Sequence, residues 1–114
     1  MNAIETLFNT EKLELHIMPA NICAKLLITR SDIDTRLKSD GGVEGMLKEL
    51  WNTINKDNVD WWIMWDFAVM QAVINPHLTK QIICRTPPEN TPRDIYLYTE
   101  IDTQAMMDDF WRVF

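Results

Sequence analysis

The chain contains little glycine, histidine and cysteine, and this scarcity excludes several kinds of functional site. Three glycines leave little material for a phosphate-binding loop. The two histidines form no His-Glu-x-x-His motif, and no nucleophile elbow is present. Cys23 and Cys84 form neither a Cys-x-x-Cys pair nor a disulfide scaffold. We therefore expect no cofactor, no enzymatic activity, and a reducing, cytoplasmic location.

Positive charge is also scarce, because 11 Lys and Arg residues face 17 Asp and Glu residues for a net charge of −6. The basic residues are dispersed among acids, which disfavours direct binding to nucleic acids or to anionic membranes. A basic protein partner would instead be attracted and oriented.

Long apolar runs are absent as well. The most apolar stretch, residues 61–74, is interrupted by Asp66 and Gln71 and is too short to span a bilayer. The first residues lack a basic region followed by an apolar run, so we expect no signal peptide.

What the chain does contain is typical of one globular domain. Hydrophobic residues make up 46% of its 114 positions and charged residues 25%. Without a repeat or a low-complexity linker, we expect residues 1–114 to form a single compact domain.

The patterns predict an α+β fold in which a small antiparallel sheet packs as one layer against four to six helices. Alternation of apolar and polar residues, or a short apolar run, predicts strands near residues 12–18, 80–85 and 95–101. Three prolines between the last two strands predict a stiff, extended loop over residues 86–94.

Helical periodicity is clearest in the stripe that ends with Trp51 and Ile54, which predicts a helix over residues 43–54 with Trp51 in the core. Further helices are expected over residues 3–9 behind Asn2, after Ser31 as N-cap, and after Asp102 as N-cap. Residues 20–30 fit a helix or, in their second half, a buried strand, and the helix is favoured.

A helix capped by Asp60 is expected over residues 61–75, ended by Asn75 and Pro76. It would carry the tryptophan cluster of Trp61, Trp62 and Trp65, for which the core is the favoured location. Trp62 would point away from the other two, which leaves some aromatic surface for a partner or for a homodimer.

Candidate chemistry in the sequence is weak. His16, Cys23, His77 and Cys84 could ligate zinc only if folding gathered four isolated residues, so we expect no metal site. Cys84 with His77 as a nucleophile pair lacks a third group to orient the histidine. The acidic pairs mostly stand where helix N-termini favour acids.

The sequence therefore favours a protein that acts by contact. Small size, acidity and surplus tryptophan are typical of small inhibitors that bind a basic or nucleic-acid-handling protein stoichiometrically. Examples of this class are toxin-immunity proteins and the anti-defence (anti-CRISPR) proteins of viruses and mobile elements. The alternatives are an assembly subunit or secretion chaperone, and a small enzyme with an unrecognised site. We predict partner-binding residues in four places: the loop over residues 86–94, which we call the proline loop, the last strand, the last helix and the tryptophan cluster. They are Arg93, Tyr96, Tyr98, Glu100, Asp108, Asp109 and Trp62.

Overall fold

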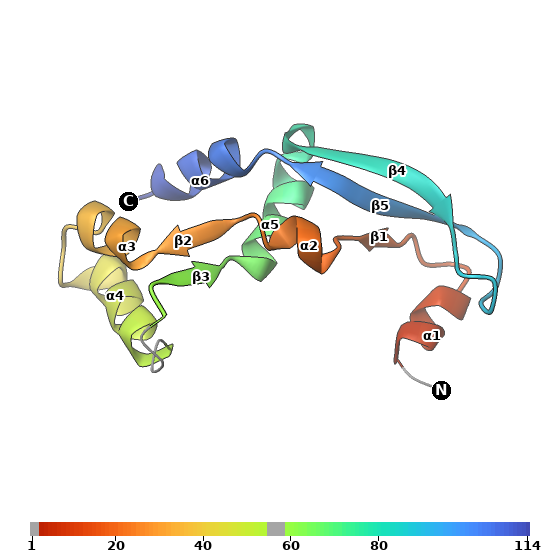
Figure 1. Cartoon of the computed structure of the whole chain (residues 1–114), viewed down its shortest axis with the longest axis horizontal. Helices are drawn as coiled ribbons and strands as arrows, with labels where there is room; N and C mark the ends of the chain where they lie inside the picture. The colour runs from red at the N-terminus through yellow and green to blue at the C-terminus, as the bar shows by residue number, and fades with distance from the viewer. Residues whose placement is uncertain (1–2, 55–58) are drawn as a thin grey trace.

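The computed structural model describes residues 3–54 and 59–114 and has an α+β fold (Figure 1). Its elements follow in the order α1 Ala3–Asn9, β1 His16–Ile17, α2 Ala20–Cys23, β2 Leu27–Thr29, α3 Arg30–Arg36, α4 Gly42–Ile54, β3 Trp61–Ile63, α5 Trp65–Ile74, the 3-10 turn η1 Pro76–Leu78, β4 Thr79–Arg85, β5 Asp94–Ile101 and α6 Thr103–Trp111. The predicted cap at Asn2 lies outside the described residues.

The three predicted strands pair into one sheet in the order β1-β5-β4. β4 and β5 are antiparallel, as expected, but β1 pairs parallel to β5, so the sheet is mixed rather than wholly antiparallel. A parallel neighbour requires a long crossover connection, and the whole middle of the chain supplies it. β1 is also much shorter than the strand predicted over residues 12–18, since it comprises only His16 and Ile17. One further backbone hydrogen bond joins Tyr96 to the Leu15 carbonyl, and Pro19 then caps α2.

Residues 20–30 contain both of the structures that the sequence allowed. α2 is a single turn that ends at Cys23, and the apolar residues after it form β2. The following helix is capped by Thr29 rather than by Ser31. The Thr29 hydroxyl accepts a hydrogen bond from the Asp32 backbone, while the Asp32 carboxylate accepts one from the Thr29 backbone, which is a capping box.

The helix predicted over residues 61–75 is wrong in its first part. Residues Trp61–Ile63 form β3, which pairs antiparallel with β2, and α5 begins only at Trp65. Met64 stands at the N-cap position in place of Asp60, without a side-chain hydrogen bond. Pairing with β2 satisfies backbone groups that a helix would have satisfied internally. The end of α5 before Asn75 and Pro76 is as predicted.

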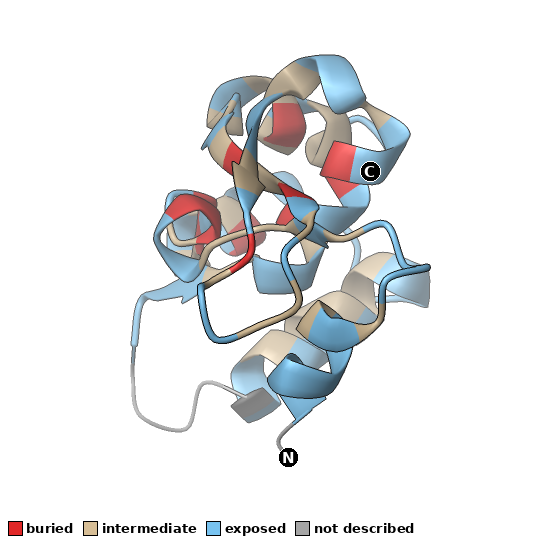
Figure 2. Cartoon of the chain, turned by 90° about the vertical axis from the view of Figure 1, so that its right-hand side faces the viewer, coloured by how far each residue is buried: buried red, intermediate tan, exposed pale blue. Residues whose placement is uncertain are grey.

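The core consists of two small clusters rather than one continuous interior. One surrounds Leu26, Ala68 and Met106, and the other surrounds Ile28, Ile33 and Leu37. Few of the described residues are buried, and much of the surface of the helices is exposed (Figure 2).

The molecule is elongated, with extents of 51 × 31 × 22 Å. Its radius of gyration is 17.4 Å, whereas a compact domain of this length is expected to have about 13 Å. Much apolar surface therefore remains in contact with water.

Candidate interaction surface

The tryptophan cluster lies on the surface instead of in the core. The side chains of Trp61, Trp62 and Trp65 are 52%, 40% and 43% exposed. Trp51, predicted as a core residue, is only half-buried, and the apolar stripe before it on α4 is largely exposed at Val43. The core location expected for Trp61, Trp62 and Trp65 is therefore wrong, whereas Trp51 lies at the margin of the core and packs against the cluster that contains Ile28. The apolar periodicity of α4 marked a face that the described elements cover only in part, because Leu47 and Trp51 pack against that cluster while Val43 stays exposed.

Three of these tryptophans line one groove, which we call the tryptophan groove. It has a volume of about 350 Å³ and lies between α4 and the segment from β3 into α5. The residues that line it are Leu50, Trp51, Trp62, Ile63, Met64, Trp65, Asp66 and Phe67. The indole rings of Trp51 and Trp62 meet edge to face, with centroids 6.0 Å apart and planes at 84°. The groove thus offers apolar and aromatic walls with one carboxylate, that of Asp66.

Strand pairing explains why Trp62 reaches this groove. Trp62 is opposite Ile28 in the β2–β3 pair, so both side chains project from the same face of the ribbon. Ile28 is fully buried against a cluster to which Trp51 of α4 also packs. Trp62 lies beside that cluster and meets Trp51 at its edge.

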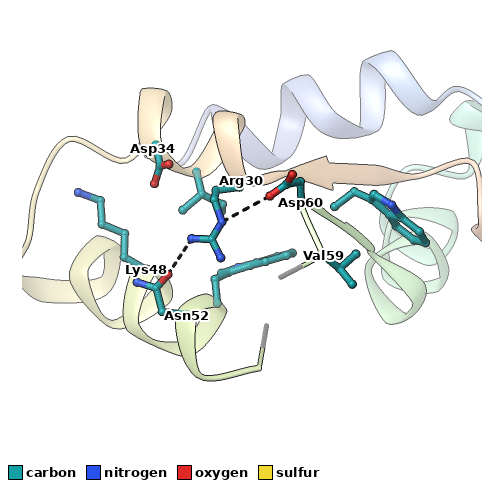
Figure 3. Close-up of a pocket in the computed structure, with 9 residues that line it drawn as sticks. Arg30, Asp34, Lys48, Asn52, Val59 and Asp60 are labelled. Atoms are coloured by element: carbon teal, nitrogen blue, oxygen red, sulfur yellow. Dashed lines mark hydrogen bonds and ion pairs between the residues drawn. The ribbon is translucent and has the colours of Figure 1, made fainter. Parts of the chain in front are cut away.

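A second, smaller hollow, which Trp51 also lines, lies between α3, α4 and the start of β3 (Figure 3). Its cations are Arg30 and Lys48. Arg30 donates to the Asn52 side-chain oxygen at 2.9 Å and lies 4.0 Å from the Asp60 carboxylate. Lys48 forms an ion pair with Asp40 at 2.9 Å. Because acids accompany both cations, this hollow offers no surplus positive charge to a phosphate or other anion.

The predicted aromatic surface on β5 is not present as expected. Tyr98 is buried, with 8% of its surface exposed, so Tyr96 and Tyr98 are not exposed together. Tyr96 is half-buried and stacks on the His16 ring, with centroids 4.5 Å apart and planes at 9°. Glu100 is exposed but pairs with Lys80 at 2.6 Å, and the hydrogen bond from Lys80 lowers the pKa of the Glu100 carboxyl.

The proline loop is attached to the N-terminal segment at several points. The Arg93 guanidinium donates to the carbonyl of Thr10, and the Arg93 backbone donates to the hydroxyl of the buried Thr86. The Thr91 backbone donates to the side chain of Asn9. Arg93 therefore holds the loop in place, and its guanidinium is already used within the chain.

Asp109 is likewise part of an internal network. Its carboxylate accepts a hydrogen bond of 2.7 Å from the buried Gln71 amide and also binds Arg112. These two hydrogen bonds lower the pKa of the Asp109 carboxyl, and the Gln71 bond has the larger effect. The neighbouring Asp108 is exposed and accepts a hydrogen bond from Gln104. The structure thus separates the two acids, and Asp109 contributes to tertiary structure.

Of the seven predicted partner-binding residues, Trp62 alone lines the tryptophan groove. Trp51, Trp65 and Asp66 line it as well, and none of the three is among the seven predicted residues. The surplus of tryptophan is the signal for Trp51 and Trp65, but the apolar periodicity around them favours the core as their location.

Chemistry-bearing side chains do not gather elsewhere in the described part of the chain. Within residues 3–54 and 59–114, no three His, Cys, Asp or Glu side chains are placed to hold a metal ion. Both cysteines are free thiols, and Cys23 is buried, which raises the pKa of its thiol. In the same residues, no helix has the length and apolar character needed to cross a membrane.

Comparison with known proteins adds no assignment. No protein-family model matches the chain, and no curated protein is significantly similar to it.

Proposed function

We propose that this chain is a binding protein that acts by stoichiometric contact with a basic protein partner, as a toxin-immunity or anti-defence inhibitor does. The observation that carries the proposal is the tryptophan groove, in which Trp51, Trp62 and Trp65 form apolar walls beside the Asp66 carboxylate. Catalysis is not part of the proposal.

The chemistry of the groove favours a cationic side chain of the partner. Tryptophan faces attract Arg and Lys through cation–π interaction, and tryptophan and arginine are the residues most enriched at interface hot spots. Asp66 lies at the first turn of α5 and makes no ion pair with another described residue. An incoming Arg would supply its counter-ion and would cover the indole rings.

The net charge of −6 favours the same partner at longer range. An acidic surface accelerates the encounter with a basic protein and orients it, with an effect that weakens as salt screens the charges. Many basic proteins handle nucleic acids, so a nuclease or another nucleic-acid-handling protein is the partner class that fits.

The test combines affinity capture from the source cells with measurement on the captured protein after purification. We expect a basic protein bound at one copy per chain, and at least a 10-fold weaker affinity for Trp62→Ala and Asp66→Asn. Phe114→Ala is the matched aromatic control, because Phe114 is 38% exposed at the C-terminus, outside the groove residues. The control should bind like the wild type.

Circular dichroism must first confirm that each variant folds. A partner that binds Trp62→Ala and Asp66→Asn as tightly as the wild type would contradict the proposed surface. Turnover of a substrate by the purified chain would contradict the proposed class of function.

A further inference from the structure

The outer face of α5 is an exposed apolar surface that no other described element covers. Val69, Met70, Val73 and Ile74 are 45%, 56%, 74% and 65% exposed. With Trp65 they occupy two adjacent rows at i,i+4 spacing, so they form one continuous face, which we call the α5 outer face.

The opposite side of α5 already supplies its share of the core. Ala68, Gln71 and Ala72 are buried there, and Phe67 packs edge to face against Phe110 of α6. α5 is therefore apolar on both sides, and only one side is covered by described residues. A helix with apolar residues all round is typical of a helix that is buried on all sides.

The size of the α5 outer face matches one side of a protein interface. Its five side chains leave on the order of 500 Å² of apolar surface in water, near the upper end of about 300–600 Å² for the largest patch of an ordinary monomer. A standard interface buries about 800 Å² per partner, and about 56–65% of that area is apolar. The face alone therefore supplies about the apolar area that a stable dimer needs from each copy.

The charge pattern of the face favours a second copy over a basic partner. Asp66 is the only charged residue on this side of α5, and it stands at one end of the helix. A face without central charge does not select a cationic partner, and it lets two acidic chains meet without opposing their acids.

An antiparallel pairing of two copies of α5 about a two-fold axis satisfies these constraints. Val69 and Met70 would lie near the axis, and Trp65 of each copy would pack beside Ile74 of the other. At 1.5 Å per residue, the two Asp66 positions would be about 10 Å apart along the direction of the helices, which exceeds the screening length of about 8 Å at physiological salt.

We propose that the α5 outer face is the interface of a symmetric homodimer of this chain. This assembly goes beyond the proposed partner binding, and the two surfaces meet at Trp65, which also lines the tryptophan groove. It would give the elongated chain, with its two small clusters, a larger continuous core.

The test is the mass of the purified chain in solution, measured by sedimentation and by light scattering over a range of concentrations. We expect twice the 13.4 kDa of one chain for the wild type. Val73→Glu should raise the dimer dissociation constant at least 10-fold, because it places a charge inside the interface. Val113→Glu is the matched control, since Val113 is 72% exposed but lies beyond the last helix.

Val73 is exposed in the single chain, so the substitution is not expected to unfold it, and Met70→Lys tests the same face independently. A wild type that stays monomeric would overturn the proposal, and so would equal effects of Val73→Glu and Val113→Glu.

β4 forms one edge of its sheet and carries the exposed Ile83. Loss of the dimer in Ile83→Lys but not in Val73→Glu would assign the contact to that edge instead. If Val73→Glu is monomeric but still binds the basic partner, then the dimer and the binding of the partner are separate properties of the chain.

Discussion

Trp51 and Trp62 belong to different elements, yet their indole rings meet edge to face with centroids 6.0 Å apart. Trp51 is contributed by α4 and Trp62 by β3, so this contact ties the helix to the β2–β3 ribbon. The same contact forms a wall of the tryptophan groove. Stability and binding therefore share these two residues, and variants at either one must be tested for both.

The first prediction concerns the energy of this ring pair. Trp51→Ala should lower the free energy of unfolding by about 2 kcal/mol, roughly half of the 3–5 kcal/mol for a fully buried aromatic residue, because Trp51 is half-buried. Edge-to-face pairs contribute about 0.5–1.5 kcal/mol beyond the area that they bury. Urea unfolding of Trp51→Ala, of Trp62→Ala and of the double variant should give a coupling energy between the two rings in that range. Additive effects would mean that the rings are adjacent without interacting.

The second prediction distinguishes the cap found in the structure from the cap expected from the sequence. Thr29→Ala removes the hydroxyl that accepts from the Asp32 backbone and should cost about 1 kcal/mol of stability. Ser31→Ala is the control, because Ser31 is exposed within the first turn of α3 and should change stability by less than about 0.5 kcal/mol. Equal denaturant midpoints for the two variants would show that the capping box contributes little.

The elements with strong local signals were predicted well. The helix over α4 follows from its apolar stripe, β5 from its alternation, and the start of α6 from Asp102, whose side chain accepts from the Ala105 backbone. Each of these signals lies within a few residues of the element that it predicts. Local periodicity and capping are physical causes that a single sequence displays directly.

The errors arose where contacts distant in sequence decide the structure. Residues 61–63 are apolar enough for either a helix or a strand, and pairing with residues 27–29 makes them a strand. Alternation correctly places Tyr96 and Tyr98 on one face of β5, but it does not say that Tyr98 becomes buried. Asp109 looked like free charge because its partner Gln71 lies on another helix. The groove depends on the same distant pairings, so the sequence supplied its tryptophans without their location.

The third prediction concerns acid stability through the Gln71–Asp109 contact. Hydrogen bonds from Gln71 and Arg112 lower the pKa of Asp109 below its ordinary value of 3.8 in the folded protein. This contribution to stability is complete above the unfolded pKa and is lost as the pH falls through the folded pKa. Asp109→Asn should therefore lower the urea midpoint at neutral pH and flatten its decline below about pH 4.

Asp108→Asn is the control for that experiment, because Asp108 bonds to Gln104 within its own helix. The urea midpoint of this variant should fall with decreasing pH in the same way as that of the wild type. Asp40 and Glu100 also have lowered pKa values, but they are unchanged in both variants and so contribute equally. Parallel profiles for Asp109→Asn and the wild type would contradict the role assigned to Asp109.

The last prediction concerns the two free thiols, which differ in their access to solvent. Cys23 is 4% exposed, and desolvation is the main cause that raises its thiol pKa, with a smaller contribution from the nearby Asp66 and an opposing backbone hydrogen bond. Cys84 is half-buried on β4, at the edge of the sheet. Thiolate is the reactive form, so Cys84 should react with a disulfide reagent at least 10-fold faster than Cys23 in the folded protein.

Cys84→Ser should remove the fast phase and Cys23→Ser the slow one, while denaturant should make both thiols react fast. A single fast phase of two thiols in the folded protein would show that the cluster around Leu26 opens readily, and the packing assigned to α2, α5 and α6 would then be wrong.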